Sequence, residues 1–210
     1  MIKDEQILIL VLIGFWIFAS CDSSIKLSDS EHKYLIELTE SENFDYSFDN
    51  EGLLVNIYDS KIVGTNDISN FSPIIAKVFF RKVVAKKKSI NAKGRIKLVY
   101  SNNNKESFAS ETKYADVVLL ELLFKSFESI INDFDSNNID NLINGISKNE
   151  IEALISVSKI TAFNLYKYQV NKTNKKNQLY WSIYHGNDKV EYYQTTFNKS
   201  NKLTGIKRIK

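Results

Sequence analysis

The most constraining feature of this 210-residue chain is a helical pattern over residues 114–134 that is apolar on almost every side. Apolar residues recur there at the three- and four-residue spacing of a helix face. They are Val117, Val118, Leu119, Leu120, Leu122, Leu123, Phe124, Phe127, Ile130 and Ile131. The polar face is narrow and consists of Glu121, Lys125, Glu128 and Asn132. Because so little of it is polar, we expect this helix to be buried on most sides, between two layers of structure.

A second apolar run, residues 7–19, lies near the start of the chain. Its length of 13 residues is too short for a helix that spans a bilayer, which needs roughly 20 residues. The length suits the apolar region of an export signal. Small residues Ala19 and Ser20 follow, then Cys21, and the sequence turns polar at Asp22. We therefore expect residues 1–20 to be a removable signal peptide.

The segment Phe18-Ala19-Ser20-Cys21 resembles the lipobox of bacterial lipoproteins, in which small residues precede a lipid-modified cysteine. The resemblance implies cleavage before Cys21, acylation with palmitate-type chains, and a membrane-anchored protein of the cell envelope in the inner or outer membrane. Cys21 is the only cysteine, so an intramolecular disulfide is excluded. A buried thiol or a catalytic nucleophile is the alternative, but a nucleophile is expected beside a histidine within the fold. Residues 21–30 would then form a tether.

Residues 31–110 predict a small α+β module. Runs rich in β-branched and aromatic residues at 34–38 and 53–58 predict strands, with an acidic turn between them. Ser72 followed by Pro73 is typical of a helix N-terminus. Alternation over residues 95–100 predicts another strand, which turns at 102–104 and returns at 105–110. The expected arrangement is a β-β-α-β-β layer.

Residues 111–210 predict the long helix, short helices and an antiparallel sheet. The short helices are expected at 139–143 and 148–156, and the strands at 162–170, 178–185, 190–197 and 203–209. Gly186 and Asn187 between two aromatic strands are typical of a hairpin turn. Sequential hairpins predict a four-stranded antiparallel meander, and the whole chain is expected to be α+β.

Part of this second half is similar to the nuclear transport factor 2-like (cystatin-like) fold, a cone of helices under a curved antiparallel sheet. The similarity is carried by Phe127-Glu128-Ser129-Ile130-Ile131, by Ser136-Asn137-Asn138-Ile139-Asp140-Asn141-Leu142 and by the hairpin at residues 197–206. It covers under half of the chain. The fold hosts isomerases, dehydratases and structural modules, so the resemblance implies no particular activity. No residue here matches an acid or base in the family's cone.

The charge of the chain argues against a nucleic-acid partner. The formal net charge is +3, and 25 of the 28 basic residues are lysines. Nucleic-acid-binding domains concentrate more Arg and Lys on one face. The lysine-rich stretch from Lys77 to Lys93 is either the solvated face of an amphipathic helix, the reading we favour, or a contact for anionic lipid head groups.

No catalytic or metal-binding residue is predicted. His32 and His185 have no partner at a triad or metal-ligand spacing, and we interpret them as exposed or turn histidines. Asp133, Asp135 and Asn137 resemble the opening of a calcium-binding EF-hand loop. The required glycine and glutamate are replaced by Asn138 and Asn144, which leaves a polar break between helices as the better explanation. Neither a nucleotide-binding loop nor a cofactor motif is present.

The tyrosines of the last strands form the best candidate interaction surface. Tyr180 and Tyr184 share a strand face opposite Trp181, and Tyr166 and Tyr168 alternate in the preceding strand. If one face of the sheet stays open, it presents tyrosines, which are enriched at interfaces. The alternative is that tyrosine fills half-buried strand positions. Tyr166, Tyr168, Tyr180 and Tyr184 are the predicted surface.

Three functions fit these observations. The first is a non-catalytic lipoprotein that binds a protein or small ligand at its sheet. The second is a small hydrolase or isomerase with a cone cavity, which requires a carboxylate of raised pKa beside a tyrosine or histidine. The third is a structural accessory of an envelope complex. We favour the first.

Overall fold

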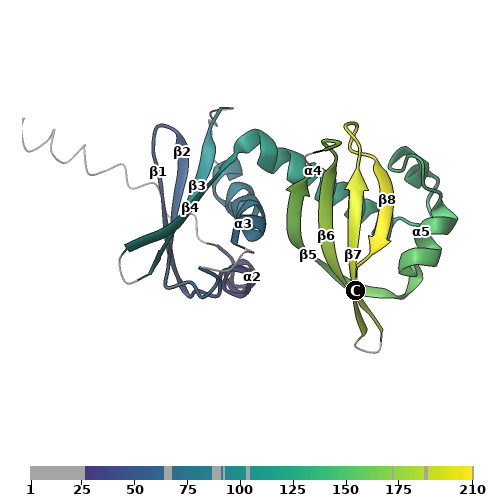
Figure 1. Cartoon of the computed structure of the whole chain (residues 1–210), viewed down its shortest axis with the longest axis horizontal. Helices are drawn as coiled ribbons and strands as arrows, with labels where there is room; N and C mark the ends of the chain where they lie inside the picture. The colour runs from purple at the N-terminus through teal and green to yellow at the C-terminus, as the bar shows by residue number, and fades with distance from the viewer. Residues whose placement is uncertain are drawn as a thin grey trace, which may run out of the picture.

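The fold is built from two four-stranded sheets with helices between and beside them (Figure 1). The computed structural model describes residues 27–63, 68–86, 91, 93–102, 105–171, 173–186 and 189–209. The predicted signal peptide, Cys21 and the tether up to residue 26 lie outside the described residues, as do parts of the predicted turns at 102–104 and 186–188. Within the described ranges, the helices are too short or too polar to cross a membrane.

The first layer is a mixed sheet covered on one side by two helices. In chain order it contains α2 (Asp29–Thr39), β1 (Asn43–Phe48), β2 (Gly52–Tyr58), α3 (Ile68–Lys82), the 3-10 turn η1 (Val84–Lys86), β3 (Arg95–Asn102) and β4 (Lys105–Lys113). The strand order is β1-β2-β3-β4. β2 and β3 are parallel, and the other two pairs are antiparallel. The expected β-β-α-β-β order is therefore present, with an additional helix before it.

That additional helix corrects one prediction. Residues 34–38, predicted as a strand, lie in α2, which begins at Asp29, within the last two residues of the expected tether. A capping box starts it, because the backbone N–H of Ser28 donates to Glu31. Leu35 and Thr39, four residues apart, are its buried positions. The first strand lies instead at β1, in the segment predicted as an acidic turn, where three aromatic residues alternate toward the core.

Helix α3 begins earlier than its sequence predicts. It starts at Ile68, so Ser72 is not its N-cap and Pro73 lies inside the helix. The hydroxyl of Ser72 donates to the carbonyl of Ile68 (2.8 Å). Lys77, predicted on a solvated basic face, is only 8% exposed. The side of α3 that carries Lys77 is therefore buried, whereas the sequence predicts that it is solvated.

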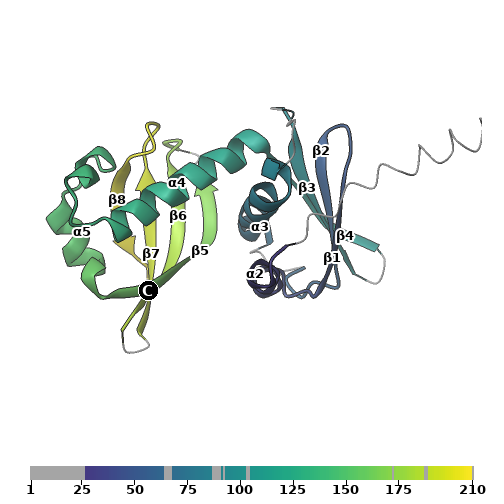
Figure 2. The ribbon, with the colours of Figure 1, turned by 180° about the vertical axis from the view of Figure 1, so that it is seen from behind.

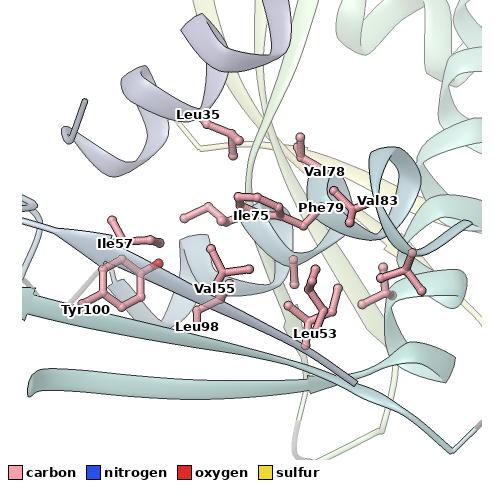
Figure 3. Packing of buried hydrophobic residues seen from close by; sticks show 14 of the residues in the cluster. Leu35, Leu53, Val55, Ile57, Ile75, Val78, Phe79, Val83, Leu98 and Tyr100 are labelled. Carbon is pink, nitrogen blue, oxygen red and sulfur yellow. The ribbon is translucent and has the colours of Figure 1, made fainter. Parts of the chain in front are cut away.

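The first core lies between α3 and the two central strands. Figure 3 shows Ile75 and Phe79 of α3 above Val55 of β2, with Leu98 of β3 alongside. The fully buried members from β2 and β3 are Leu53, Val55, Ile57, Ile96, Leu98 and Tyr100. Alternate residues of each strand face this core, so the opposite face of the sheet carries the polar side chains.

The second layer is an antiparallel meander, as predicted. It follows α4 (Tyr114–Asn132), η2 (Asn137–Asn141), α5 (Lys148–Ile155) and η3 (Val157–Lys159), and consists of β5 (Ile160–Val170), β6 (Asn177–His185), β7 (Lys189–Phe197) and β8 (Leu203–Arg208). Each strand pairs with the next in antiparallel register. Figure 2 shows α4 crossing one face of this sheet.

Helix α4 is present where the sequence predicts it, but it is buried on one face only. Leu120, Leu123 and Phe127 are buried against the second sheet. Val118 and Leu122 are 42% and 48% exposed. The second sheet lies on one side of the helix (Figure 2), whereas Val118 and Leu122 stay exposed to solvent.

The two layers meet where α2 and α3 approach the edge strand β5 (Figures 1 and 2). Ile74 of α3 belongs to the second core. The Tyr34 hydroxyl donates to the carbonyl of Leu165 (3.4 Å), and Lys77 Nζ lies 3.3 Å from Glu121 Oε2. An α3 side chain is thus tied to α4, and an α2 side chain to β5.

Candidate functional site

One face of the second sheet carries a cluster of tyrosine rings. The rings of Tyr166 and Tyr180 are 6.3 Å apart, and those of Tyr166 and Tyr192 are 5.7 Å apart, both in edge-on geometry. Such edge-on pairs are favourable beyond the area they bury. The rings come from β5, β6 and β7, so they bridge three neighbouring strands. Helix α4 lies on the opposite face, and the tyrosine face is uncovered in Figure 1.

A β-bulge in β5 decides which tyrosines reach this face. The register shifts between Leu165 and Lys167, so the simple alternation of side chains is broken at Tyr166. Tyr166 points to the tyrosine cluster. Tyr168, which we predicted on the same face, instead packs against the second core, and its hydroxyl donates to Asn177 Oδ1 (3.0 Å). Burial raises the pKa of Tyr168 to about 12.

Polar side chains surround the tyrosines on the same face. Gln169 Nε2 donates to the hydroxyl of Tyr180 and to Gln178 Oε1 (3.0 Å). Lys167 Nζ lies 5.0 Å from the centre of the Tyr180 ring, within the range of a cation–π contact. Burial raises the pKa of Tyr180 and of Tyr166, so both hydroxyls are protonated at neutral pH and can donate hydrogen bonds.

The edge of the cluster is open to solvent. Tyr192 is 37% exposed, and the neighbouring Val190 is 38% exposed. Tyr184 is half-buried and stands opposite Val190 in the register. Tyr192 was not among the predicted residues. The two-residue alternation of β7 places it outside and Tyr193 inside. The tyrosine face is therefore defined here as Tyr166, Tyr180, Tyr184 and Tyr192.

The inner face of the same sheet holds a buried cluster of titratable groups. His185, predicted as an exposed or turn histidine, is buried, and its Nε2 lies 3.3 Å from Glu191 Oε2. The Tyr193 hydroxyl donates to Glu191 and to the carbonyl of Leu154 (3.0 Å). Lys189 and Arg208 lie 2.6 Å and 2.7 Å from Glu191 Oε1. Glu191 is thus surrounded by donors and cations.

These neighbours hold Glu191 in its charged form. The hydrogen bond from Lys189, then that from Tyr193, lower the pKa of Glu191 from its ordinary 4.5 to about 2, and Arg208 acts in the same direction. Burial, and then the bond to Glu191, raise the pKa of Tyr193 to about 12. The cluster therefore keeps a fixed carboxylate at neutral pH, which is suited to joining β6, β7 and β8.

We expect Glu191→Gln to destabilise the protein by about 1–3 kcal/mol at pH 7, because the charge-assisted bonds are lost. This corresponds to a fall in Tm of roughly 2–12 °C for a chain of this size. The folded pKa lies below the unfolded one, so this stabilisation is complete above pH 4.5 and is lost as the pH falls toward 2. The difference in Tm between wild type and the Glu191→Gln variant, measured by thermal unfolding, should become smaller as the pH falls from 4.5 toward 2.

Glu111→Gln is the matched control, because its carboxylate is exposed and pairs only at the surface with Arg95 (3.1 Å). Surface pairs contribute about 0–1 kcal/mol. Two results would contradict a stabilising role for the charged Glu191. One is a Glu191→Gln variant as stable as the Glu111→Gln variant. The other is a difference in Tm between wild type and Glu191→Gln that does not change with pH.

The other sequence candidates do not converge on a site. In the described part of the chain, no group of three or more His, Cys, Asp or Glu side chains is placed to hold a metal ion. His32 is exposed, with its ring 5.0 Å from that of Phe44. Asp133 caps the C-terminus of α4 and is exposed. Cys21 lies outside the described residues.

Comparison with known proteins returned no match among family models, curated proteins or solved structures.

Proposed function

We propose that this chain is a non-catalytic lipoprotein of the cell envelope, anchored through Cys21, that binds a partner protein with the tyrosine face. The observation that carries the proposal is the ring cluster of Tyr166, Tyr180 and Tyr192 on an uncovered sheet face. The anchor is supported by the lipobox-like segment before Cys21.

The chemistry of the face suits recognition of a protein. Tyrosine presents a large, rigid contact area with two rotatable bonds and a hydroxyl that can donate or accept. Here the tyrosines lie beside Gln169, which bonds to the buried Gln178 and is itself partly exposed, so that its amide can adapt to either polarity of a partner group. Exposed Val190 adds apolar area beside them. This mixture of aromatic and short polar side chains is typical of binding surfaces.

A partner protein fits this face better than a small molecule. Small-molecule sites are concave pockets that enclose most of their ligand. The tyrosine face instead spreads over three strands and is uncovered (Figure 1). A partner that covers these strands would bury the edges of several rings at once, which is how clustered aromatic residues contribute binding energy.

The alternative of an enzyme with a cone cavity has less support. Such an enzyme needs a carboxylate of raised pKa, whereas the carboxylate beside a tyrosine and a histidine, Glu191, has a lowered one. The order of α4, short helices and a meander supports the proposed likeness to the nuclear transport factor 2-like fold. That likeness is compatible with a structural module.

A photo-cross-linking amino acid placed at position 192 in intact cells tests the proposal. We expect one cross-linked species of defined mass, because a specific partner covers this position. The same cross-linker at Lys97, on the outer face of the first sheet, is the control and should give no such species.

The purified partner would then be titrated with wild type and with the Tyr166→Ser/Tyr192→Ser variant. Central interface tyrosines contribute about 2 kcal/mol or more when truncated, so we expect the affinity to fall at least about tenfold. Cross-linking that is equal at positions 192 and 97, or an affinity unchanged in the double variant, would refute the tyrosine face as the binding site.

A further inference from the structure

A cleft of about 220 Å³ lies where the two layers meet. Its walls come from α2, α3, α4 and β5, so both layers contribute to it. Ligand sites occur preferentially at such junctions. The volume is large enough for a molecule of roughly ten non-hydrogen atoms.

The charged groups of the cleft are mostly positive. Lys77, Arg81 and Lys82 of α3 line it, against one lining carboxylate, that of Glu31. Glu31 is already paired with Lys82. Lys77 is paired with Glu121 at 3.3 Å. The described part of the chain contains no hydrogen-bonding or ion-pairing partner for the exposed Arg81 side chain, which leaves a guanidinium free at the cleft.

Lys77 links the charged and apolar sides of the cleft. Its Nζ lies 3.9 Å from the centre of the Phe124 ring, a cation–π contact, and Lys77 is buried. Burial lowers the pKa of Lys77, and Arg81 acts in the same direction, while Glu121 opposes both. Additional negative charge in the cleft would favour the protonated form of Lys77.

The rest of the lining is largely aromatic and aliphatic. The rings of Phe124 and Phe163 lie 6.3 Å apart at 39° to each other, and Val78 and Leu165 also line the space. Tyr34 closes one side, with its hydroxyl 3.4 Å from the carbonyl of Leu165. A bound molecule would therefore meet an apolar surface at one end and cations at the other.

We propose that this cleft binds a small carboxylate with an apolar body. Arg81 holds the carboxylate head by a forked pair of hydrogen bonds, the geometry for which a guanidinium is suited. The apolar body lies against Phe124 and Phe163. The Lys77–Glu121 pair joins α3 to α4 and holds Lys77 in place at the cleft.

Isothermal titration calorimetry of the full chain in a non-ionic detergent, with benzoate and with hexanoate, tests this proposal. We expect at least one of the two to bind with a dissociation constant of about 1 mM or tighter, as suits ligands of this size. Benzamide and hexanamide, which lack the charge, should bind at least about tenfold more weakly. Arg81→Ala should weaken the carboxylate at least about tenfold, and Arg81→Lys should have an intermediate effect.

Lys97→Ala is the control for net charge, because it removes one positive charge from the first sheet, away from the cleft. Its affinity should equal that of wild type. Arg81 is exposed, so its substitution should leave the fold intact, and circular dichroism would verify this. Three outcomes would overturn the proposal. Neither carboxylate binds at about 10 mM, the amides bind as tightly as the carboxylates, or the Arg81→Ala variant binds the carboxylates as tightly as wild type does.

Discussion

Trp181→Ala is expected to lower the stability of the protein by about 3–5 kcal/mol, the range for removal of a large aromatic side chain from a core. Trp181 is fully buried, and its ring stacks on that of Phe127 at 4.2 Å. It also contacts Phe124 and Phe163, so three elements, α4, β5 and β6, lose a common packing partner. The expected fall in Tm, followed by circular dichroism, is roughly 6–20 °C.

Two further variants show whether this loss comes from packing. Trp181→Phe keeps an aromatic ring but removes the indole N–H that donates to Thr195 Oγ1 (2.8 Å), so we expect a smaller loss of about 1–2 kcal/mol. Leu122→Ala removes an apolar side chain from the exposed side of α4 and should change stability by less than about 0.5 kcal/mol. A Trp181→Ala variant as stable as Leu122→Ala would show that α4 does not depend on this contact.

The second half of the chain could be predicted from its sequence because its signals are long and mutually consistent. The strands β5 to β8 run for six to eleven residues, β5 to β7 are rich in aromatic residues, and polar turns separate the strands. Such runs are longer than chance alternation produces. Helix α4, at 19 residues, is equally clear.

The first half was harder because a short segment carries less information. The run at 34–38 contains β-branched and aromatic residues, which favours a strand by propensity alone. The capping box of Ser28 and Glu31 lies six residues earlier and favours a helix. The local start signal prevails here over propensity, and packing of Leu35 in the first core adds to it. Ser72-Pro73 is also a short signal and was misleading: it is typical of a helix start, but α3 begins four residues earlier, at Ile68.

Burial could not be predicted from the pattern of α4 alone. Its sequence is apolar nearly all round, but the structure buries one side only, with Tyr114 and Val117 in the first core and the later turns in the second. Which apolar residues stay exposed depends on how many layers surround a helix, and this is a tertiary property that a local pattern does not contain. Val118 and Leu122 are apolar residues of α4 that stay exposed for this reason.

The candidate site could be predicted in part, and the two errors have different causes. Alternation identifies the face of Tyr180 and Tyr184 correctly, but a bulge in β5 moves Tyr168 to the other face, and no residue type marks that bulge. The partner of His185 was missed for a different reason. His185 continues the inward alternation of Trp181, so an inward Glu191 on the next strand was predictable from the hairpin register.

Cys21→Ala is expected to abolish lipid modification, because the acyl chains have no other attachment point in a chain with a single cysteine. In a bacterial host that modifies lipoproteins, wild type should incorporate radiolabelled palmitate, and the variant should incorporate none. The intact mass should change too: wild type loses residues 1–20 and gains the mass of its acyl groups, whereas the variant keeps residues 1–20. Equal label on both proteins would refute the anchor.

Ser24→Ala is the matched control, since it alters a small polar residue three positions after the cysteine and leaves the thiol in place. It should be labelled like wild type. The anchor follows from the length of the apolar run and from the affinity of acyl chains for a bilayer. A 13-residue apolar run is too short for a stable span of a hydrocarbon core that is about 30 Å thick. Several acyl chains, each contributing about 0.8 kcal/mol per buried CH₂, hold a protein firmly at the membrane. An unlabelled wild-type protein of full precursor mass would instead show that residues 1–20 are retained and that the partner must be sought where that uncleaved chain resides.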